Sequence, residues 1–195
     1  MAKTPTRHNS SVDSLNLSFK SPKSPSQDGS PLTKRLIVIL QNLTTNYASW
    51  RVYHRKGINI CRAIETAKCK ALEKQLQFPD DLVPFCKELE SLLKSLEDIV
   101  ENTRGVVKQI SALVKLDRDA NAVLKSWNSR KSEKFAEEVL RAFEEEFRIK
   151  KLVKQNIAFA LSHAELVHMS CVWEYQFYVN ADIAMGFAII EAEMR

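Results

Sequence analysis

The sequence predicts an all-α protein, an elongated antiparallel helical bundle with coiled-coil-like packing that follows a disordered N-terminal tail. None of the 111 residues from Phe85 to Arg195 is proline. Beyond residue 32 only three glycines occur, and the Asn-Gly and Asp-Gly pairs typical of β-hairpins are absent. Apolar residues there recur every three or four positions. These observations favour long helices over sheet.

Residues 1–32 form the predicted tail. They hold four of the six prolines and eight serines, with few large apolar side chains. A segment of this composition cannot bury enough surface to offset its chain entropy, so we expect it to be disordered. Four Ser/Thr-Pro pairs, the pattern that proline-directed kinases read, indicate a regulatory tail. The candidate phosphorylation sites are Thr4, Ser21, Ser24 and Ser30.

A short basic and apolar motif follows the tail. Lys34, Leu36 and Ile37 match the basic-x-Leu-apolar pattern of segments that dock on cyclins. The same residues suit the first turn of a helix, and the sequence favours this second interpretation. Cyclin docking stays open as the alternative.

The first helix is expected over residues 33–77. Ser30 and Pro31 suit an N-cap and a first helical position, and Pro79 should end the helix.

The second helix is expected over residues 80–116. Ten positions from Leu82 to Leu113 alternate by three and four, and nine of them are apolar. This heptad pattern predicts coiled-coil-like packing against other helices.

The remaining helices are expected over residues 129–163, 165–179 and 182–194. The first of these has a wider apolar stripe, which is typical of a helix with two neighbours. The stretch from Gln155 to Ile190 has only three formal charges and is apolar on most sides. Either the bundle itself or another protein must cover such a segment. The candidate partner-binding residues are Trp173, Tyr175, Phe177 and Tyr178.

The charge distribution limits the kinds of partner. The net charge is +5, but residues 1–35 hold six Lys/Arg against two Asp, so the rest of the chain is nearly neutral. Direct nucleic-acid binding is therefore not favoured. A basic stripe from Arg51 to Lys74 leaves it as an alternative. An acidic run from Lys134 to Glu146 indicates instead that neighbouring helices carry opposite charges.

No catalytic, cofactor or metal motif is found. There is no glycine-rich phosphate loop and no His-x-x-x-His pair, and Glu144, Glu145 and Glu146 are expected to form a solvated run. The four cysteines form no Cys-x-x-Cys pair, and Cys86 and Cys171 are expected to be buried. Without a secretory signal or an apolar stretch that could span a bilayer, we expect an intracellular, non-enzymatic protein with reduced thiols and no membrane association.

The order of these features resembles the cyclin-dependent kinase 2-interacting protein family. The likeness covers roughly Leu43 to the C-terminus, and its second half is the most specific part. The matching features are Trp50 in the first long helix, the heptad run that starts at Cys86, the pair Trp127 and Phe135, the helix Phe143-Glu-Glu-Glu-Phe-Arg-Ile-Lys-Lys-Leu-Val, and Trp173-Glu-Tyr-Gln-Phe-Tyr-Val.

The resemblance implies a non-enzymatic adaptor that is located in the nucleus and also in the cytoplasm. Family members bind cyclin-dependent kinase and replication or checkpoint proteins. They also act, with a small helical companion, as a subunit of a complex of AAA+ ATPases that remodels pre-ribosomal particles and replisome components. The family has no catalytic residues to carry over. A coiled-coil subunit of a kinetochore or tethering complex would show the same heptads and is the alternative.

Overall fold

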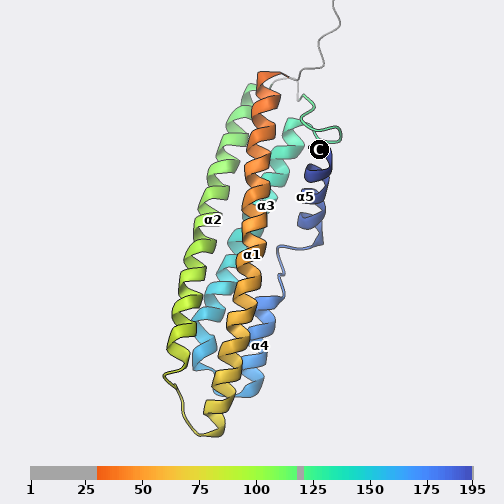
Figure 1. The fold of residues 1–195 in the computed structure, drawn as a ribbon. Coiled ribbons are helices and arrows are strands. Elements are labelled where there is room, and N and C mark those ends of the chain that lie inside the picture. Colours follow the sequence, from red (N-terminus) through yellow and green to blue (C-terminus); the bar gives the residue numbers. More distant parts are fainter. Residues whose placement is uncertain (1–29, 118–120, 195) are drawn as a thin grey trace, which may run out of the picture.

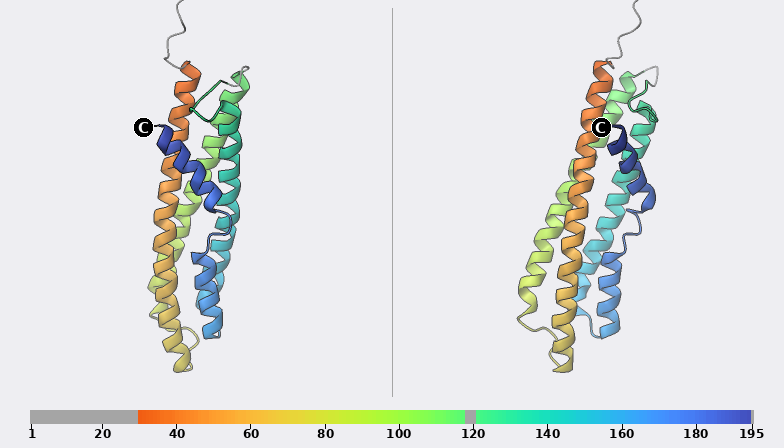
Figure 2. Two further views of the ribbon diagram at one scale, coloured as in Figure 1. Left: turned by 90° about the vertical axis from the view of Figure 1, so that its right-hand side faces the viewer. Right: turned by 45° about the vertical axis from the view of Figure 1, so that its right-hand side comes forward.

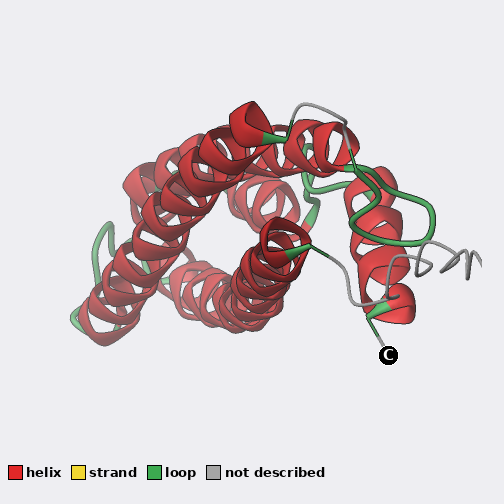
Figure 3. Cartoon of the chain, turned by 90° about the horizontal axis from the view of Figure 1, so that it is seen from above, coloured by secondary structure: helices red, strands yellow, loops and turns green. Residues whose placement is uncertain are grey.

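All regular secondary structure in the described residues is helical, as Figure 3 shows along the long axis. The computed structural model describes residues 30–117 and 121–194. The predicted tail therefore lies almost wholly outside the described residues, together with Thr4, Ser21 and Ser24. The elements are α1 (Pro31–Glu73), α2 (Leu82–Leu116), α3 (Ser129–Asn156), the 3₁₀ turn η1 (Ile157–Phe159), α4 (His163–Glu174) and α5 (Ala181–Glu193).

The helices form an elongated up-and-down bundle. α1, α2 and α3 run side by side along its length in alternating directions, which confirms the predicted all-α bundle (Figure 1). Two short helices together take the place of a fourth long helix. α4 covers one half of the bundle and α5 covers the other half (Figure 2). Both run in the same direction, so they resemble one helix interrupted by residues 175–180.

The ends of α1 follow from local chemistry. Ser30 caps the first turn by accepting a hydrogen bond from the Thr33 amide at 3.2 Å, and Pro31 follows it. The helix begins at Pro31, as these two residues predict, and thus two residues before the expected range of 33–77. It also ends four residues before the predicted end, at Glu73, because Gln75 adopts a left-handed φ of 58°. The Leu76 amide then bonds back to the Ala71 carbonyl at 2.9 Å, closing a Schellman motif.

The heptad positions of α2 face the bundle core. Eight of the ten are buried, and only Phe85 and Leu113 are partly exposed. The single polar member, Thr103, satisfies its hydroxyl by bonding to the Ile99 carbonyl at 2.8 Å. The heptad pattern thus identified the buried face of this helix correctly.

Aromatic pairs join the elements of the half that α5 covers. Trp127 packs edge-on against Phe135, with ring centroids 4.9 Å apart. Phe135 in turn contacts Phe187 of α5, which stacks on Tyr47 of α1 at 4.1 Å. The two aromatics that the family resemblance paired are therefore neighbours in space, and together they hold α5 against α1 and α3.

The C-terminal half differs from the expected boundaries. α3 ends at Asn156 rather than 163, and the chain passes through η1 before Ser162 caps α4. α4 ends at Glu174 rather than 179. α5 begins one residue before its predicted start, where the Asn180 side chain accepts from the amides of Asp182 and Ile183. Each capping residue satisfies amides that have no helical partner.

Candidate docking strap and its buried support

The segment between α4 and α5, residues 175–180, is the candidate functional site, and we call it the strap. It exposes three of the four predicted partner-binding side chains. Tyr175 is 69% exposed, Phe177 54% and Tyr178 46%. The rings of Tyr175 and Phe177 lie 5.0 Å apart between centroids. Large aromatic side chains that remain in solvent on adjacent positions are typical of interaction surfaces.

Two hydrogen bonds anchor the strap to the bundle. The Gln176 side-chain oxygen accepts a bond of 2.8 Å from the indole nitrogen of Trp50. The backbone amide of Tyr178 donates to Glu146 Oε2 at 3.3 Å. Since both Trp50 and Glu146 are fully buried, these bonds fix the strap from beneath while its aromatic rings face solvent.

A buried ammonium group lies under the strap. Lys150 and Glu146 are both fully buried and form an ion pair at 3.2 Å. Lys150 Nζ also donates to the Trp173 carbonyl at 3.0 Å and contacts His54 Nδ1 at 3.2 Å. The three N–H bonds of a lysine ammonium thus find three acceptors. This network joins α1, α3 and α4 at the end of α4 where the strap begins.

Burial sets the protonation of this network. Desolvation lowers the pKa of Lys150, whereas the Glu146 carboxylate raises it. Desolvation, with the positive charges of Lys150 and Arg55, lowers the pKa of His54 to about 3. His54 is therefore neutral near pH 7, and its Nδ1 is free to accept from Lys150. Desolvation also raises the pKa of the nearby Cys61 thiol to about 12, so this thiol is not a nucleophile at neutral pH.

Trp173 is a core residue, which corrects its prediction as an exposed partner-binding residue. Its side chain is fully buried, and its indole nitrogen donates to the His54 carbonyl at 3.2 Å. The ring lies directly over Gly57 of α1, where an added Cβ would sit 2.2 Å from Trp173 Cζ2. The ring also packs beneath the Lys150 ammonium at 4.8 Å. Trp173 supports the strap from inside the bundle.

Two open pockets flank the strap. One, of about 400 Å³, lies on the α4 side and is lined mainly by apolar and aromatic groups, among them Val172, Tyr175 and Phe177. The other, of about 580 Å³, lies between α3, the strap and α5. Its charged lining is mostly acidic and consists of Glu138, Glu145, Asp182 and Arg141. A partner at the strap thus meets an aromatic surface next to negative charge.

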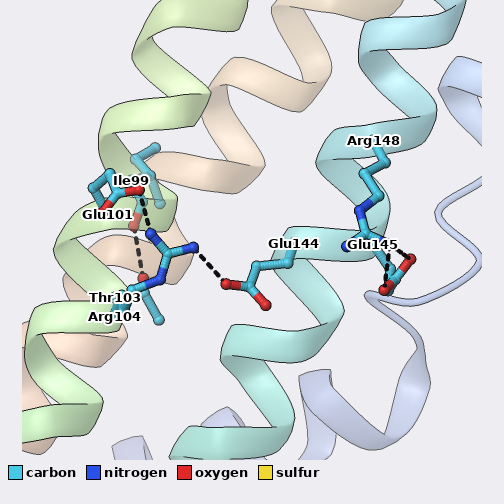
Figure 4. Close-up of polar contacts among 7 residues, drawn as sticks. All are labelled: Ile99, Glu101, Thr103, Arg104, Glu144, Glu145 and Arg148. Atoms are coloured by element: carbon cyan, nitrogen blue, oxygen red, sulfur yellow. Dashed lines mark hydrogen bonds and ion pairs between the residues drawn. The ribbon is translucent and has the colours of Figure 1, made fainter.

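The three consecutive glutamates of α3, at positions 144–146, do not form one solvated surface. Figure 4 shows Arg104 of α2 between Glu101 and Glu144, and Arg148 one turn beyond Glu145. Glu146, however, is fully buried against Lys150, so the prediction that it is solvated is wrong. The run pairs with α2 and with its own helix, rather than with the basic stripe of α1.

The basic stripe of α1 is not a uniform surface. Lys68 is buried and donates to the Gln77 carbonyl in the loop after α1. Arg62 binds both oxygens of Glu174 at the end of α4, at 2.8 and 3.1 Å. Arg51 and Lys56 lie over the rings of Tyr47 and Tyr53. Four of the seven cations therefore make contacts within the protein, which weakens the nucleic-acid alternative.

The predicted cyclin-docking motif is part of α1. Leu36 is fully buried in the core, Ile37 is partly buried and Lys34 is exposed. In the folded bundle Leu36 cannot enter a groove on another protein, so the helix-start interpretation holds. Ser30, the one candidate phosphorylation site within the described residues, is exposed at the N-cap of α1.

The fold creates one cysteine–histidine contact that sequence spacing could not reveal. Cys69 Sγ of α1 lies 3.0 Å from His163 Nδ1 at the start of α4. Burial and the charges of Glu65 and Glu73 raise the pKa of the Cys69 thiol, so the pair lacks the depressed thiol pKa of a catalytic dyad. Among the described residues, no three His, Cys, Asp or Glu side chains are grouped to hold a metal ion.

The remaining thiols are free. Cys86 is partly exposed and Cys171 is exposed, so the prediction that both are buried is wrong. Helix α4 is short, and Cys171 faces away from the side on which Leu166, Ser170 and Trp173 meet the bundle.

No protein-family model and no curated protein matches this chain. The likeness to the cyclin-dependent kinase 2-interacting protein family therefore depends on the sequence motifs alone. Within residues 30–117 and 121–194, no helix combines the length and apolar character needed to cross a membrane.

Proposed function

We propose that this chain is a non-enzymatic adaptor of the cyclin-dependent kinase 2-interacting protein type, which docks through its strap on a larger assembly. The observation that carries this proposal is the exposure of Tyr175, Phe177 and Tyr178 on a segment whose backbone is held by buried polar groups. The family resemblance supplies the kind of assembly, a nuclear complex of AAA+ ATPases with a small helical companion. It also supplies cyclin-dependent kinase and replication or checkpoint proteins as further partners.

The geometry of the strap supports a docking role. Tyrosine and other aromatic side chains contribute much of the binding energy at protein interfaces, because they bury large areas with few rotatable bonds. A segment that is already fixed pays less conformational entropy on binding than a free loop does. The Gln176 and Tyr178 hydrogen bonds provide this fixation here.

The surroundings of the strap favour a partner segment with apolar and basic side chains. An apolar side chain would enter the pocket formed by Val172, Tyr175 and Phe177. Lysine or arginine would suit the acidic pocket on the other side of the strap. Such charge complementarity adds specificity and speeds association.

The test is affinity purification of the tagged full chain, followed by mass spectrometry of the bound proteins. The triple variant Tyr175→Ala, Phe177→Ala, Tyr178→Ala removes the aromatic surface without touching the buried network. The control is Val52→Ser, which alters a side chain 53% exposed on α1. We expect the wild type and the control to recover AAA+ ATPase subunits and the helical companion, and the triple variant to lose them while keeping its helical circular dichroism.

Two results would contradict the proposal. Equal recovery by the triple variant would show that the strap is not the docking surface. Recovery of a kinetochore or tethering complex without an ATPase would show that the family likeness is only shared heptad composition.

A further inference from the structure

A second unpartnered surface lies near the C-terminal end of α3, beyond the residues that line the acidic pocket. Phe78, in the loop after α1, stacks on Phe159 of η1 with centroids 5.9 Å apart. These rings are 45% and 68% exposed, and Val83 beside them is 38% exposed. With Cys86 and Ala158 they line an open pocket of about 390 Å³. We call this the distal pocket.

The distal pocket continues into a groove along α2 and α3. A neighbouring pocket of about 590 Å³ shares four lining residues with it, so the two pockets adjoin along the same pair of helices. The groove extends along α2 from Val83 to Glu97, which at 1.5 Å per residue is about 20 Å. This length matches about four turns of a helix lying in the groove.

The groove is positively charged. Its lining contains four lysines against two glutamates: Lys87, Lys94, Lys151, Lys154, Glu90 and Glu97. Lys154 pairs with Glu90 at 3.4 Å, and Lys151 lies over the Phe147 ring at 4.9 Å. Lys87 and Lys94 are exposed and make no ion pair among the described residues. They are available to an acidic ligand.

We propose that this groove docks an acidic amphipathic helix of a partner protein, with a large apolar side chain in the distal pocket and carboxylates against Lys87 and Lys94. The chain's own residues 1–29 do not have the required charge, since they hold four Lys/Arg against two Asp. Residues 1–29 are therefore not the occupant, and we assign the groove to a partner protein. The groove does not overlap the strap, so this interaction is independent of the proposed docking there.

The change of sign along α3 gives the two surfaces opposite preferences. The acidic residues Glu138 and Glu145, in the middle of α3, line the pocket beside the strap, whereas Lys151 and Lys154, nearer its C-terminal end, line the groove. A segment that suits one surface is repelled by the other. An adaptor needs two such surfaces to hold two partners at once, each in its own place.

The test uses a labelled synthetic peptide of 14 residues, with Leu and Phe at helical three-four spacing and Glu at the other positions. A matched peptide has Lys in place of each Glu. Fluorescence anisotropy is measured with the full chain that carries the strap triple variant, so that the aromatic surface of the strap cannot take up the basic peptide. It should show that the acidic peptide binds, and that the basic peptide binds at least about tenfold more weakly. Equal binding of both peptides would overturn the proposal, because charge would then not select the occupant.

Two variants locate the binding site. Phe159→Ser removes an exposed ring from the distal pocket, and Lys87→Glu reverses a charge in the groove. Each should weaken binding of the acidic peptide by about tenfold. Lys108→Glu, an exposed charge reversal elsewhere on α2, should leave it unchanged. The strap triple variant should also bind the peptide normally, so failure of one docking site is distinguishable from failure of the other. Unchanged binding by both groove variants would contradict the site.

Discussion

At the scale of single residues, the fold depends on a close approach between α1 and α4 that only glycine permits. An added Cβ at Gly57 would lie 2.2 Å from the fully buried Trp173 ring. Gly57→Ala should therefore destabilise the protein by about 1–3 kcal/mol, through overpacking. Gly105 of α2 is the matched control, because an added Cβ there meets nothing within 4 Å. Gly105→Ala should stabilise by about 0.4–1 kcal/mol, since alanine restricts the unfolded chain.

Urea denaturation followed by circular dichroism measures both glycine variants. A lower midpoint for Gly57→Ala and a raised midpoint for Gly105→Ala, with equal slopes, are the expected results. If Gly57→Ala unfolds at the wild-type midpoint, Trp173 does not pack on α1 as described.

The residues of the strap were only partly predictable. The stretch of low charge around Tyr175, Phe177 and Tyr178 indicated a special surface, but not which aromatic faces inward. Composition cannot distinguish Trp173 from its neighbours, because its burial depends on Gly57, 116 positions away. The buried pair of Glu146 and Lys150 was missed, although a signal existed.

That signal is the periodicity of α3. Phe143, Glu146, Lys150, Val153 and Ile157 follow one another by three and four, so the pair occupies core positions of an apolar stripe. Two opposite charges four residues apart at such positions predict a buried ion pair. The three consecutive glutamates at 144–146 also look like a local charge run, and this conceals the periodicity.

At the scale of the elements, the ion pair of α3 holds neighbouring helices in place. Lys150→Met leaves the Glu146 carboxylate buried without its partner and should cost about 3–5 kcal/mol of stability. The double variant Glu146→Leu, Lys150→Met removes both charges and should recover most of this loss. A double-mutant cycle in urea provides the measurement. If the double variant is as unstable as the sum of the single variants, the two side chains act independently.

Element boundaries show where sequence patterns stop being informative. Heptad periodicity predicted the buried face of α2 because nine of ten positions are apolar. Pro79 predicted that α1 must end before it, but not that the left-handed Gln75 ends the helix at Glu73. The sequence predicts the end of α3 too late, because an apolar stretch continues across η1. Ser162, a readable N-cap, was the available sign of a new helix.

At the scale of the whole molecule, the interrupted fourth helix is what gives the bundle its candidate site. A continuous helix would have buried or spread the aromatic residues along one face. Ending α4 at Glu174 and restarting at Ala181 places three exposed aromatic side chains on the strap. The sequence predicted a break near Asn180. Its extent could not be predicted, since it depends on buried Trp50 and Glu146 holding the strap.

The stability of the whole bundle should fall in acid, partly through His54. Because burial and the charges of Lys150 and Arg55 lower its pKa to about 3, His54 stays neutral in the folded protein below pH 6.5, whereas the unfolded chain takes up a proton. Stability is therefore unaffected by His54 above pH 6.5. It decreases between pH 6.5 and about 3, by at most about 1.4 kcal/mol per pH unit.

His54→Asn separates this effect from the titration of carboxylates. Its side-chain oxygen can take the place of Nδ1 as the acceptor for Lys150, but asparagine does not titrate. Urea midpoints at pH 7.5 and pH 4.5 should therefore decrease more in the wild type than in the variant, while carboxylate effects are common to both. An equal decrease would mean that folded His54 takes up a proton as easily as the unfolded chain. The ammonium of Lys150, 3.2 Å from Nδ1, opposes such uptake, because a second positive charge would replace a hydrogen-bond acceptor in the core.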